Sequence, residues 1–441
     1  MLETFKNAFK IKEVRHKIIF TFLLLLFYRF GCYIPVPGIG SQLIDQDTLG
    51  SVTYLGIMSM MTGGSLASGT WFALGISPYI NSSIIVQLLT VAFPRLERWS
   101  KEGEEGRRKI NSLTRILALV LAIIQSIGIL INFGGNLKNS TTSTPLAVLL
   151  GGGGFGTFLA YAIAVIFYCS GAVVVVWIGE RITDYGVSNG ISLLIFAGIL
   201  ATAGQAVIRL LGGAFGTSAS KEGFWTLLWY VVAIIIIFGC IVFVDGAERK
   251  IQVQYAKQVK GRKMYGGQST VIPIKVNANG VMPLIFAFSI VSFPELIITM
   301  FWPMSKAARW WSNWMGTNSW LYMIVLCVLI FAFAFFYNQI QFNPDDISKS
   351  IQQNGGFIPG IRAGRPTTEY LKKISKRITL FGAIFLALIA LIPSIIFRII
   401  DPSVSSVFSA TGMLIAVSVA LEFNTALESQ IMMKNYKGFL K

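Results

Sequence analysis

Long apolar runs and shorter polar stretches alternate along the whole chain. Each apolar run is about 20 residues long, the length that an α-helix needs to cross a hydrocarbon core about 30 Å thick. The first run continues into Pro-Val-Pro-Gly without a small-residue cleavage site, which favours a retained span over a signal peptide. The pattern predicts an all-α polytopic membrane protein with ten transmembrane helices, at roughly residues 18–36, 74–94, 113–134, 154–178, 190–211, 223–244, 279–301, 318–338, 377–397 and 404–424.

The segment just before the second run does not fit a simple membrane anchor. Residues 54–70 read YLGIMSMMTGGSLASGT and are about half as long as a span. A helix of about 12 residues reaches only about 18 Å, so it can enter the protein without crossing the membrane. Glycines and serines loosen this backbone, and methionines pack flexibly against irregular surfaces. We therefore expect a flexible half-helix here.

The composition agrees with a membrane protein, and the charges orient it. Only 13% of the 441 residues are charged, whereas a soluble domain carries about 25%. The positive-inside rule places the side that is rich in Lys and Arg, with both termini, in the cytoplasm. Most of the 37 Lys and Arg residues lie on that side if ten spans alternate, in the segments 1–17, 95–115, 179–189, 245–278, 339–376 and 425–441.

Cysteine and histidine patterns argue against metal sites and nucleophilic catalysis. The four cysteines lie singly in apolar runs, and His16 is the only histidine. The run GGGGFG at 151–156 matches a nucleotide-binding fingerprint only loosely, because it lies between spans with no strand–helix unit around it. The sequence contains no P-loop. We therefore expect no cofactor, no metal and no enzymatic activity of the chain itself.

A short internal repeat divides the chain. Residues 75–80 read GISPYI and residues 280–285 read GVMPLI, five spans later. Matching Gly/Pro interruptions in two halves of a membrane protein indicate an inverted repeat with the working site between the halves. An ion-coupled solute transporter would need ionisable groups near the midplane. The apolar runs hold almost none, although a ten-span transporter remains the alternative at this point.

Isoleucines stand at the repeat instead. Ile76 and Ile80 are four residues apart and share one helix face, and Ile191 and Ile195 do the same in the fifth run. Ordinary packed or lipid-facing isoleucines would show the same spacing. The spacing alone therefore does not assign them a role.

Longer motifs carry a resemblance that extends from the first run to the last. They read FALGISPYINSSIIVQLL at 72–89, KEGEEGRRKI at 101–110, SNGISLLIFAGI at 188–199, YAKQVKGRKMYGGQSTVIPIKVNANGVMPLIFA at 255–287 and GGFIPGIRAGRPTTEYLKKI at 355–374. In these motifs the chain resembles the SecY family, the channel subunits of the bacterial protein translocase. One departure is DGAERK at 245–250, where the family often has paired arginines.

The resemblance implies two pseudo-symmetric five-helix halves around an hourglass pore. The halves would cover 18–211 and 212–424, flanked by a cytoplasmic N-terminal segment, 1–17, and a cytoplasmic tail, 425–441. Residues 54–70 match the plug of the outer funnel, with plug residues Tyr54, Met58, Met60, Met61, Gly63, Gly64 and Gly69. The ring at the neck of the pore corresponds to Ile76, Ile80, Ile191, Ile195, Ile285 and Ile415.

The resemblance also implies a lateral gate and a docking surface. Spans two and three, with seven and eight, match the gate, where Asn81, Gln87 and Phe293 would lie. A purely structural role for Gln87 stays open. In loop 245–278, alternating apolar and polar residues predict a β-hairpin with a basic tip. The docking residues for the motor ATPase SecA or the ribosome would be Arg249, Lys250, Arg262, Lys263 and, in loop 339–376, Arg362.

We therefore expect a protein-conducting channel of the plasma membrane that moves unfolded preproteins across and releases membrane segments sideways into lipid. Its expected partners are SecE, SecG, SecA, the ribosome, signal sequences and nascent chains. With no ATP site of its own, the channel would be driven by SecA or by the ribosome. A membrane-embedded enzyme is a third possibility, but the sequence offers no catalytic constellation for it.

Overall fold

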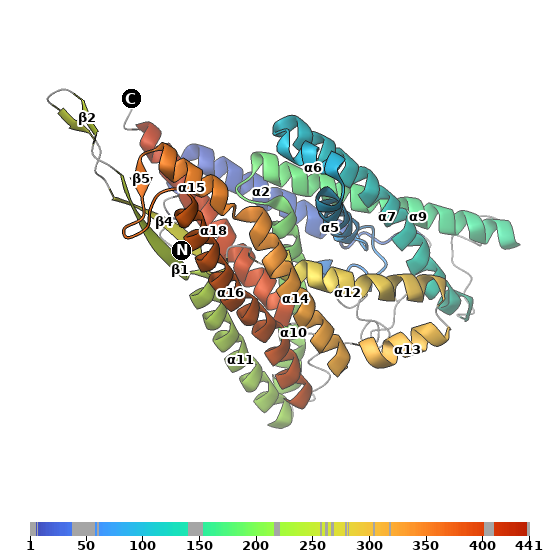
Figure 1. Cartoon of the computed structure of the whole chain (residues 1–441). Coiled ribbons are helices and arrows are strands. Elements are labelled where there is room, and N and C mark those ends of the chain that lie inside the picture. Colours follow the sequence, from blue (N-terminus) through green and yellow to red (C-terminus); the bar gives the residue numbers. More distant parts are fainter. Residues whose placement is uncertain are drawn as a thin grey trace.

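The structure is a computed structural model of the chain. It describes residues 6, 8–37, 58–59, 61–139, 153–215, 221–255, 258–260, 263–265, 269–277, 280, 282–302, 305–316, 319–400 and 410–438. Within these residues, each of the ten apolar runs coincides with one long helix (Figure 1). These helices are α2 (Lys12–Gly31), α5 (Ser77–Ala92), α7 (Glu104–Asn139), α9 (Gly153–Tyr185), α10 (Gly190–Phe215), α11 (Lys221–Asp245), α12 (Met282–Phe301), α14 (Trp320–Gln341), α16 (Arg365–Ile400) and α18 (Ala410–Gly438).

Length and composition allow several of these helices to cross a membrane. Among the described residues, five segments are long and apolar enough, and they belong to α7, α9, α11, α14 and α16. Shorter apolar segments lie in α10 and α12. Three short helices connect the long ones: α6 (Pro94–Lys101), α13 (Lys306–Met315) and α15 (Pro344–Gln353).

The internal repeat produces the same helix start in α5 and α12. Gly75 and Gly280 have φ values of +51° and +58°, a conformation that glycine adopts without strain. Each helix begins two residues later and has proline as its second residue, Pro78 in α5 and Pro283 in α12. Proline fits there because the N–H groups of a first helical turn have no partner within the helix. The two helices thus begin alike, as the repeat predicts.

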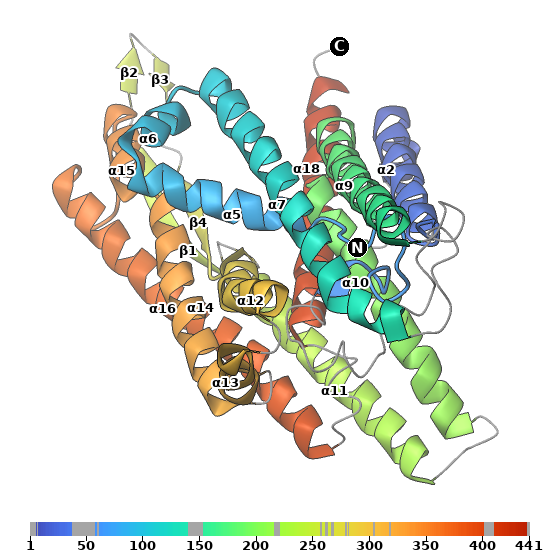
Figure 2. The ribbon, with the colours of Figure 1, turned by 90° about the vertical axis from the view of Figure 1, so that its right-hand side faces the viewer.

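The long helices form two groups that touch along two lines. In the first group α5 packs on α7, α7 on α9, and α9 on α10 and α2. In the second group α12 packs on α14, α14 on α16, α16 on α18, and α18 on α11. Figure 2 shows α14 and α16 on one flank of the molecule and α2 and α9 on the other. The groups meet where α7 packs on α12, and where α10 packs on α11 and α18.

The predicted β-hairpin is present, and it gains a strand from the other long loop. Strand β1 (Glu248–Tyr255) pairs antiparallel with β4 (Ser269–Lys275), and Glu248 faces Lys275 at the base. Strands β2 (Gln258–Lys260) and β3 (Lys263–Tyr265) pair beyond them. Strand β5 (Gly356–Phe357) joins the free edge of β1, where Gln254 pairs with Phe357. The sequence pattern did not predict β5, which is only two residues long.

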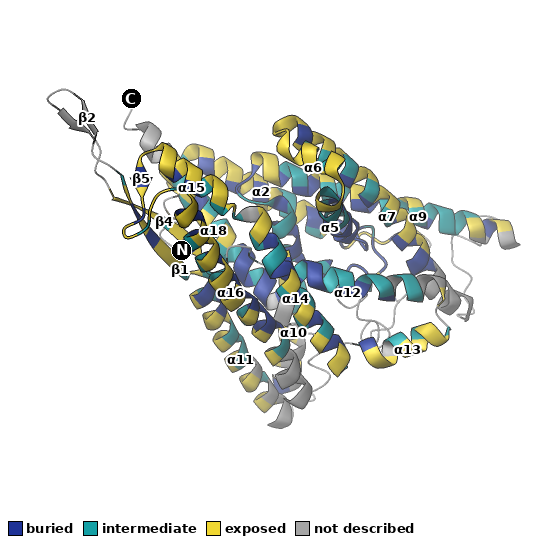
Figure 3. Cartoon of the chain, in the orientation of Figure 1, coloured by how far each residue is buried: buried dark blue, intermediate teal, exposed yellow. Residues whose placement is uncertain are grey.

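Apolar side chains pack between the helices and also cover much of the outside. The largest buried cluster draws on α2, α5, α9, α10, α11, α12, α13, α14, α16 and α18. Figure 3 shows exposed residues along the outer faces, which on α2 and α11 include large apolar side chains such as Phe30 and Phe243. Exposed apolar faces of this extent are unfavourable in water and suit a lipid environment.

Candidate functional site

The six isoleucines that the sequence analysis assigns to the ring lie at or near the starts of their helices. Ile76 is the residue before α5, and Ile80 lies in the first turn of that helix. Asn189 caps α10, because its side-chain oxygen accepts hydrogen bonds from the N–H groups of Ile191 (3.0 Å) and Ser192 (3.4 Å). This cap fixes the turn that carries Ile191 and, one turn later, Ile195. The remaining two are Ile285 in the first turn of α12 and Ile415 in α18.

All six isoleucines belong to the largest apolar cluster. Four of them, Ile76, Ile80, Ile195 and Ile415, are buried, while Ile191 and Ile285 are half-buried and pack against the cluster. A set drawn from four helices far apart in the sequence thus contributes to one continuous apolar region. Its members carry no hydrogen-bonding side-chain group.

An open cavity of about 670 Å³ borders this apolar region. Ile195, Ile285 and Ile415 form part of its wall. The wall also holds further apolar residues, such as Met282 and Leu421, and its charged residues are Asp245, Glu248, Lys275 and Glu422. The cavity, which we call the chamber, therefore combines polar and apolar groups, has three of the predicted ring isoleucines in its lining, and adjoins the base of the β-hairpin.

The plug segment is less helical than the sequence predicts. Within its described residues, only Met58, Ser59 and Met61 are helical, and residues 62–69 form consecutive turns. The reason is local: Gly63, Gly64 and Gly69 have φ values of +67°, +86° and +58°, which a right-handed helix does not contain. The expectation of a helix of about 12 residues is wrong for the part after Met61. Tyr54 and Met60 lie outside the described residues.

The plug segment sits directly on α10 and α2. Gly198 of α10 has no room for a Cβ atom, because the carbonyl of Met61 occupies that position. A Cβ atom on Gly63 would collide with the Nη1 atom of Arg29 in α2. Met58 and Leu66 are buried in a second apolar cluster with residues of α7 and α9. Backbone contact and apolar packing thus hold this segment.

The residues just after the plug are held by hydrogen bonds and ring stacking in addition to apolar packing. The N–H of Trp71 donates to the carbonyl of Ile34 (2.8 Å), and its indole N–H donates to the Ser170 hydroxyl of α9 (3.0 Å). Phe72 stacks on Tyr28 of α2, with ring centroids 5.9 Å apart. The plug therefore has a fixed C-terminal anchor and a glycine-rich stretch before it.

A polar contact joins the two helix groups at the predicted gate. The hydroxyl of Tyr337 in α14 donates a hydrogen bond to the side-chain oxygen of Gln87 in α5. The Tyr337 ring stacks on Phe286 of α12, with centroids 4.8 Å apart. Gln87 was a predicted gate residue, whereas its partner Tyr337, 250 residues later, was not identified from the sequence.

The other two predicted gate residues lie on the same helices. Asn81 is buried in α5, and Phe293 is half-buried in α12. The seam between the groups is formed by α5 and α7 on one side and by α12 and α14 on the other. These four helices correspond to spans two, three, seven and eight.

The predicted docking residues lie on the sheet and on the loop that joins it. Arg249 and Lys250 are exposed on β1, and Lys250 forms an ion pair with Glu248 (3.2 Å). Arg362 is exposed five residues after β5. Lys263 begins β3, and Arg262 lies outside the described residues. Because β5 pairs with β1, the sheet holds the two long loops together.

Comparison with known proteins decides the family. The SecY family model matches residues 70–424. The chain belongs to the SecY family. The protein translocase subunit SecY of Streptomyces galbus is 40% identical over 454 residues, which cover 100% of both chains. That of Staphylococcus carnosus (strain TM300) is 37% identical over 441 residues, which cover 100% of this chain and 99% of the relative.

Solved structures share the SecY fold of this chain. A structure of a protein conducting channel has a TM-score of 0.62 and 19% identity, and covers 94% of this chain and 91% of its own. Sec61 in the canine ribosome-channel complex from the endoplasmic reticulum has a TM-score of 0.58 and 18% identity, with the same coverage. At such identities the likeness concerns the fold alone.

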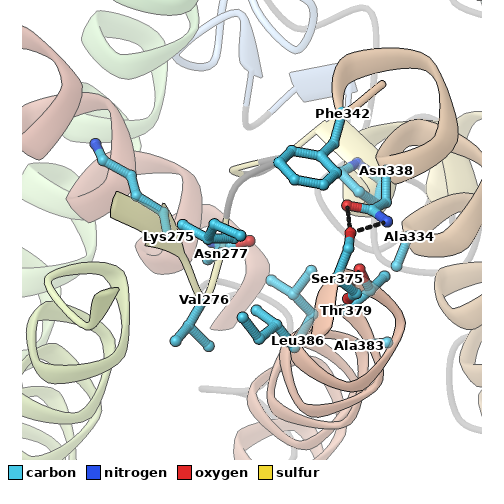
Figure 4. A pocket seen from close by; sticks show the side chains of 14 residues that line it. Lys275, Val276, Asn277, Ala334, Asn338, Phe342, Ser375, Thr379, Ala383 and Leu386 are labelled. Atoms are coloured by element: carbon cyan, nitrogen blue, oxygen red, sulfur yellow. Dashed lines mark hydrogen bonds between the residues drawn. The ribbon is translucent and has the colours of Figure 1, made fainter. Parts of the chain in front are cut away.

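A second, much smaller pocket of this SecY chain is a packing contact between helices rather than a ligand site. It lies between β4, α12, α14 and α16 and offers about 20 Å³, room for about one water molecule. Figure 4 shows Asn338 of α14 and Ser375 of α16 facing each other there. They exchange hydrogen bonds of 2.8 and 3.1 Å. Among the described residues, no three His, Cys, Asp or Glu side chains gather into a metal site.

Proposed function

We propose that this SecY-family chain is the protein-conducting channel of a Sec translocase, which moves unfolded preproteins across a membrane. The observation that carries the proposal is the chamber of about 670 Å³, whose wall holds charged residues together with three of the predicted ring isoleucines. A translocating chain bears every kind of side chain, so the neck must bind none of them. Branched apolar residues exclude water and ions by dewetting and offer a passing peptide no hydrogen bond.

The plug segment supports a resting seal on the far side of the ring. Its contacts with α10 and α2 are backbone and apolar contacts, and its anchor begins at Trp71. Glycines in the left-handed region permit backbone changes that other residues would resist. We propose that the segment leaves its seat about this anchor when a chain enters.

The seam supports sideways release. Among the described residues, a hydrogen bond between Gln87 and Tyr337 joins α5 to α14. Side-chain hydrogen bonds between membrane helices contribute about 0.6 kcal/mol on average. A signal sequence that offers a continuous apolar helix gains more than that by packing into the seam. We propose that such a helix displaces the contact and reaches lipid there, at the seam where Asn81 and Phe293 also lie.

The sheet supports a docking role on one face of the membrane. Exposed Arg249, Lys250 and Arg362 give this face basic groups, which attract ribosomal RNA phosphates or acidic protein surfaces. We propose that SecA or the ribosome binds here and drives translocation, and that SecE and SecG complete the complex. We further propose that the membrane is the plasma membrane, with both termini in the cytoplasm.

Reconstitution tests this function. Vesicles that contain the chain with SecE and SecG receive SecA, ATP and a labelled preprotein. We expect the preprotein to become protected from external protease, and the same preprotein without its signal sequence to stay accessible. Full accessibility of the intact preprotein, in vesicles that hold a folded complex, would contradict the proposal.

A further inference from the structure

Asp245 uses both of its carboxylate oxygens to join three parts of the molecule. It is the last residue of α11, directly before the β-hairpin. Its Oδ1 atom accepts a hydrogen bond from the side-chain amide of Asn277 (2.7 Å). Its Oδ2 atom accepts one from the hydroxyl of Ser418 in α18 (2.6 Å). One side chain thus connects α11, the segment that leaves β4, and α18.

The first of these hydrogen bonds closes the base of the hairpin. Glu248 and Lys275 form the last residue pair of β1 and β4. Beyond that pair, the N–H of Val276 donates to the carbonyl of Ala247 (3.0 Å). The hydrogen bond between Asp245 and Asn277 connects the two chain segments once more, just outside the sheet. The segments that enter and leave the hairpin are therefore held together at its base.

The second hydrogen bond reaches the helix that carries a ring isoleucine. Ser418 follows Ile415 by three residues, so the two lie on neighbouring positions of one helix surface. Both line the large cavity, together with Asp245, Asn277 and Ile285. A displacement of the hairpin base therefore acts on α18 within one turn of the ring.

The chemistry of the bridge requires an acceptor with two separate oxygens. Hydrogen bonds to a carboxylate are shorter and stronger than those between neutral groups, and each oxygen here serves one partner. Among the described residues, Asp245 forms no ion pair, so these two hydrogen bonds position its side chain. Ser418 is largely buried, and its bond to Asp245 lies at the wall of the large cavity.

We propose that Asp245 is a positioning residue that couples docking on the hairpin to the ring isoleucines through Ser418 and α18. The inference rests on the proposed channel function and extends it. Docking shifts the hairpin base, the carboxylate carries the shift to α18, and the neck at Ile415 changes its packing. Coupling between two sites is a free energy that depends on the connection, so cutting the connection lowers the coupling without removing either site.

Ser418→Ala is the sharpest test, because it removes one hydroxyl and leaves the hairpin base intact. In the reconstituted complex we expect the SecA dissociation constant to stay within about twofold of wild type. We expect SecA-driven translocation to fall at least about fivefold, the lower end of usual coupling factors. Ser418→Thr keeps the hydroxyl and should restore translocation.

Two further variants separate coupling from stability. Ser375→Ala also removes a buried hydroxyl that joins two helices, α14 and α16, but it lies outside the Asp245 bridge. Its melting temperature in detergent should be similar to that of Ser418→Ala. Its translocation rate should nevertheless equal that of wild type. Combining Asp245→Ala with Ser418→Ala should lower translocation no further than Asp245→Ala alone, because both changes cut the same connection.

Each outcome is decisive. If Ser418→Ala weakens SecA binding as much as it slows translocation, the bridge only supports the docking surface and the coupling role is refuted. If Ser418→Ala translocates at the wild-type rate, or if Ser375→Ala is equally slow, the inference is also wrong. Failure of the wild-type complex to move any preprotein would instead refute the channel function itself.

Discussion

The predicted ring isoleucines have one property in common, a branched apolar side chain that forms no hydrogen bond. Ile195, Ile285 and Ile415 line the large cavity together with charged residues such as Asp245 and Lys275. A neck of this kind resists wetting because water and ions would lose hydrogen bonds on entering it. How well such a neck excludes water and ions depends on the volume of its side chains more than on any single contact.

We predict that replacing Ile80, Ile191 and Ile285 together with glycine opens an ion leak in the resting channel. The wider, less apolar neck wets more easily. Planar-bilayer conductance measures the effect and should rise well above the wild-type level.

A matched control uses the same helices. Ile84, Ile199 and Val291 are buried in the same apolar cluster, farther along α5, α10 and α12. Their triple glycine variant destabilises the bundle by a comparable amount, yet should conduct like wild type. Wild-type conductance of the first variant would remove these isoleucines from the ring.

A second prediction concerns Arg362. Its side chain is exposed, and its backbone carbonyl accepts a hydrogen bond from the Thr367 hydroxyl (2.8 Å). Arg362→Glu should therefore fold normally but reverse a charge of the docking surface. We expect SecA-driven preprotein import into vesicles to fall at least about tenfold, the effect of about 1.4 kcal/mol. Arg365→Glu, also exposed, is the control, and equal import by both variants would remove Arg362 from the surface.

Single site residues were predicted from the family resemblance, not from their contacts. The family motifs contain Gln87, but no pattern connects it with Tyr337, because the pairing depends on how two helix groups meet. Asp245 was noted only as part of a departure from the family pattern. Its two hydrogen bonds depend on residues 32 and 173 positions away. Such contacts arise from tertiary packing, which local sequence patterns do not encode.

At the scale of elements, the sheet unites two loops that are separate in the sequence. The alternation of apolar and polar residues on β1 predicted the hairpin. The structure agrees, because Ile251 and Val253 are buried on one face of the strand. A two-residue strand such as β5 shows no alternation and escapes prediction. The prediction of a plug helix failed for another reason, because its glycines adopt a left-handed backbone conformation. The glycine-rich composition indicates a flexible segment, but it does not specify that the segment forms turns.

We predict that Gly356→Val detaches β5 from β1. A Cβ atom at this position would lie 2.9 Å from the Tyr255 ring and 3.1 Å from Ile351, so β5 must shift. Amide hydrogen exchange at residues 354–358 should accelerate, and SecA binding should weaken severalfold because Arg362 loses its fixed position. Resting conductance should not change.

Phe357→Leu provides the comparison for that variant. The Phe357 side chain is exposed, and the substitution leaves the backbone pairing with Gln254 in place. Hydrogen exchange and SecA binding should match wild type. Unchanged exchange in Gly356→Val would show that β5 tolerates the side chain and that the sheet does not organise the docking loop.

At the scale of the whole molecule, two helix groups enclose a chamber and meet at a seam. The apolar runs located all ten long helices, because length and hydropathy are local properties. They did not reveal which helices are neighbours, since helices that face lipid are apolar on several sides. The two-group arrangement followed from the internal repeat and the family resemblance, and the chamber became visible only in three dimensions.

We predict that joining the seam stops translocation. After replacement of the four native cysteines, Gln87→Cys and Tyr337→Cys place thiols on α5 and α14, whose native side chains touch. A short cleavable thiol cross-linker should react efficiently in the resting state. Preprotein import should then fall to background and return after cleavage, because a signal sequence needs the seam to open.

The single-cysteine variants, treated with the same reagent, control for chemical damage. They should import preproteins at the rate of the cysteine-free chain. If the cross-linked double variant imports at the full rate, the seam does not need to open, and the lateral-gate mechanism fails for this protein.

The seat of the plug on α10 has a consequence for how this sequence tolerates change over time. Gly198 meets the carbonyl of Met61, a group that every amino acid possesses, so the contact is indifferent to the side chain at position 61. A substitution at position 61 can therefore accumulate without losing this contact. At position 198 even the smallest side chain, alanine, would collide with the plug backbone. Genetic drift is thus permitted at position 61 as far as this contact is concerned, and forbidden at position 198.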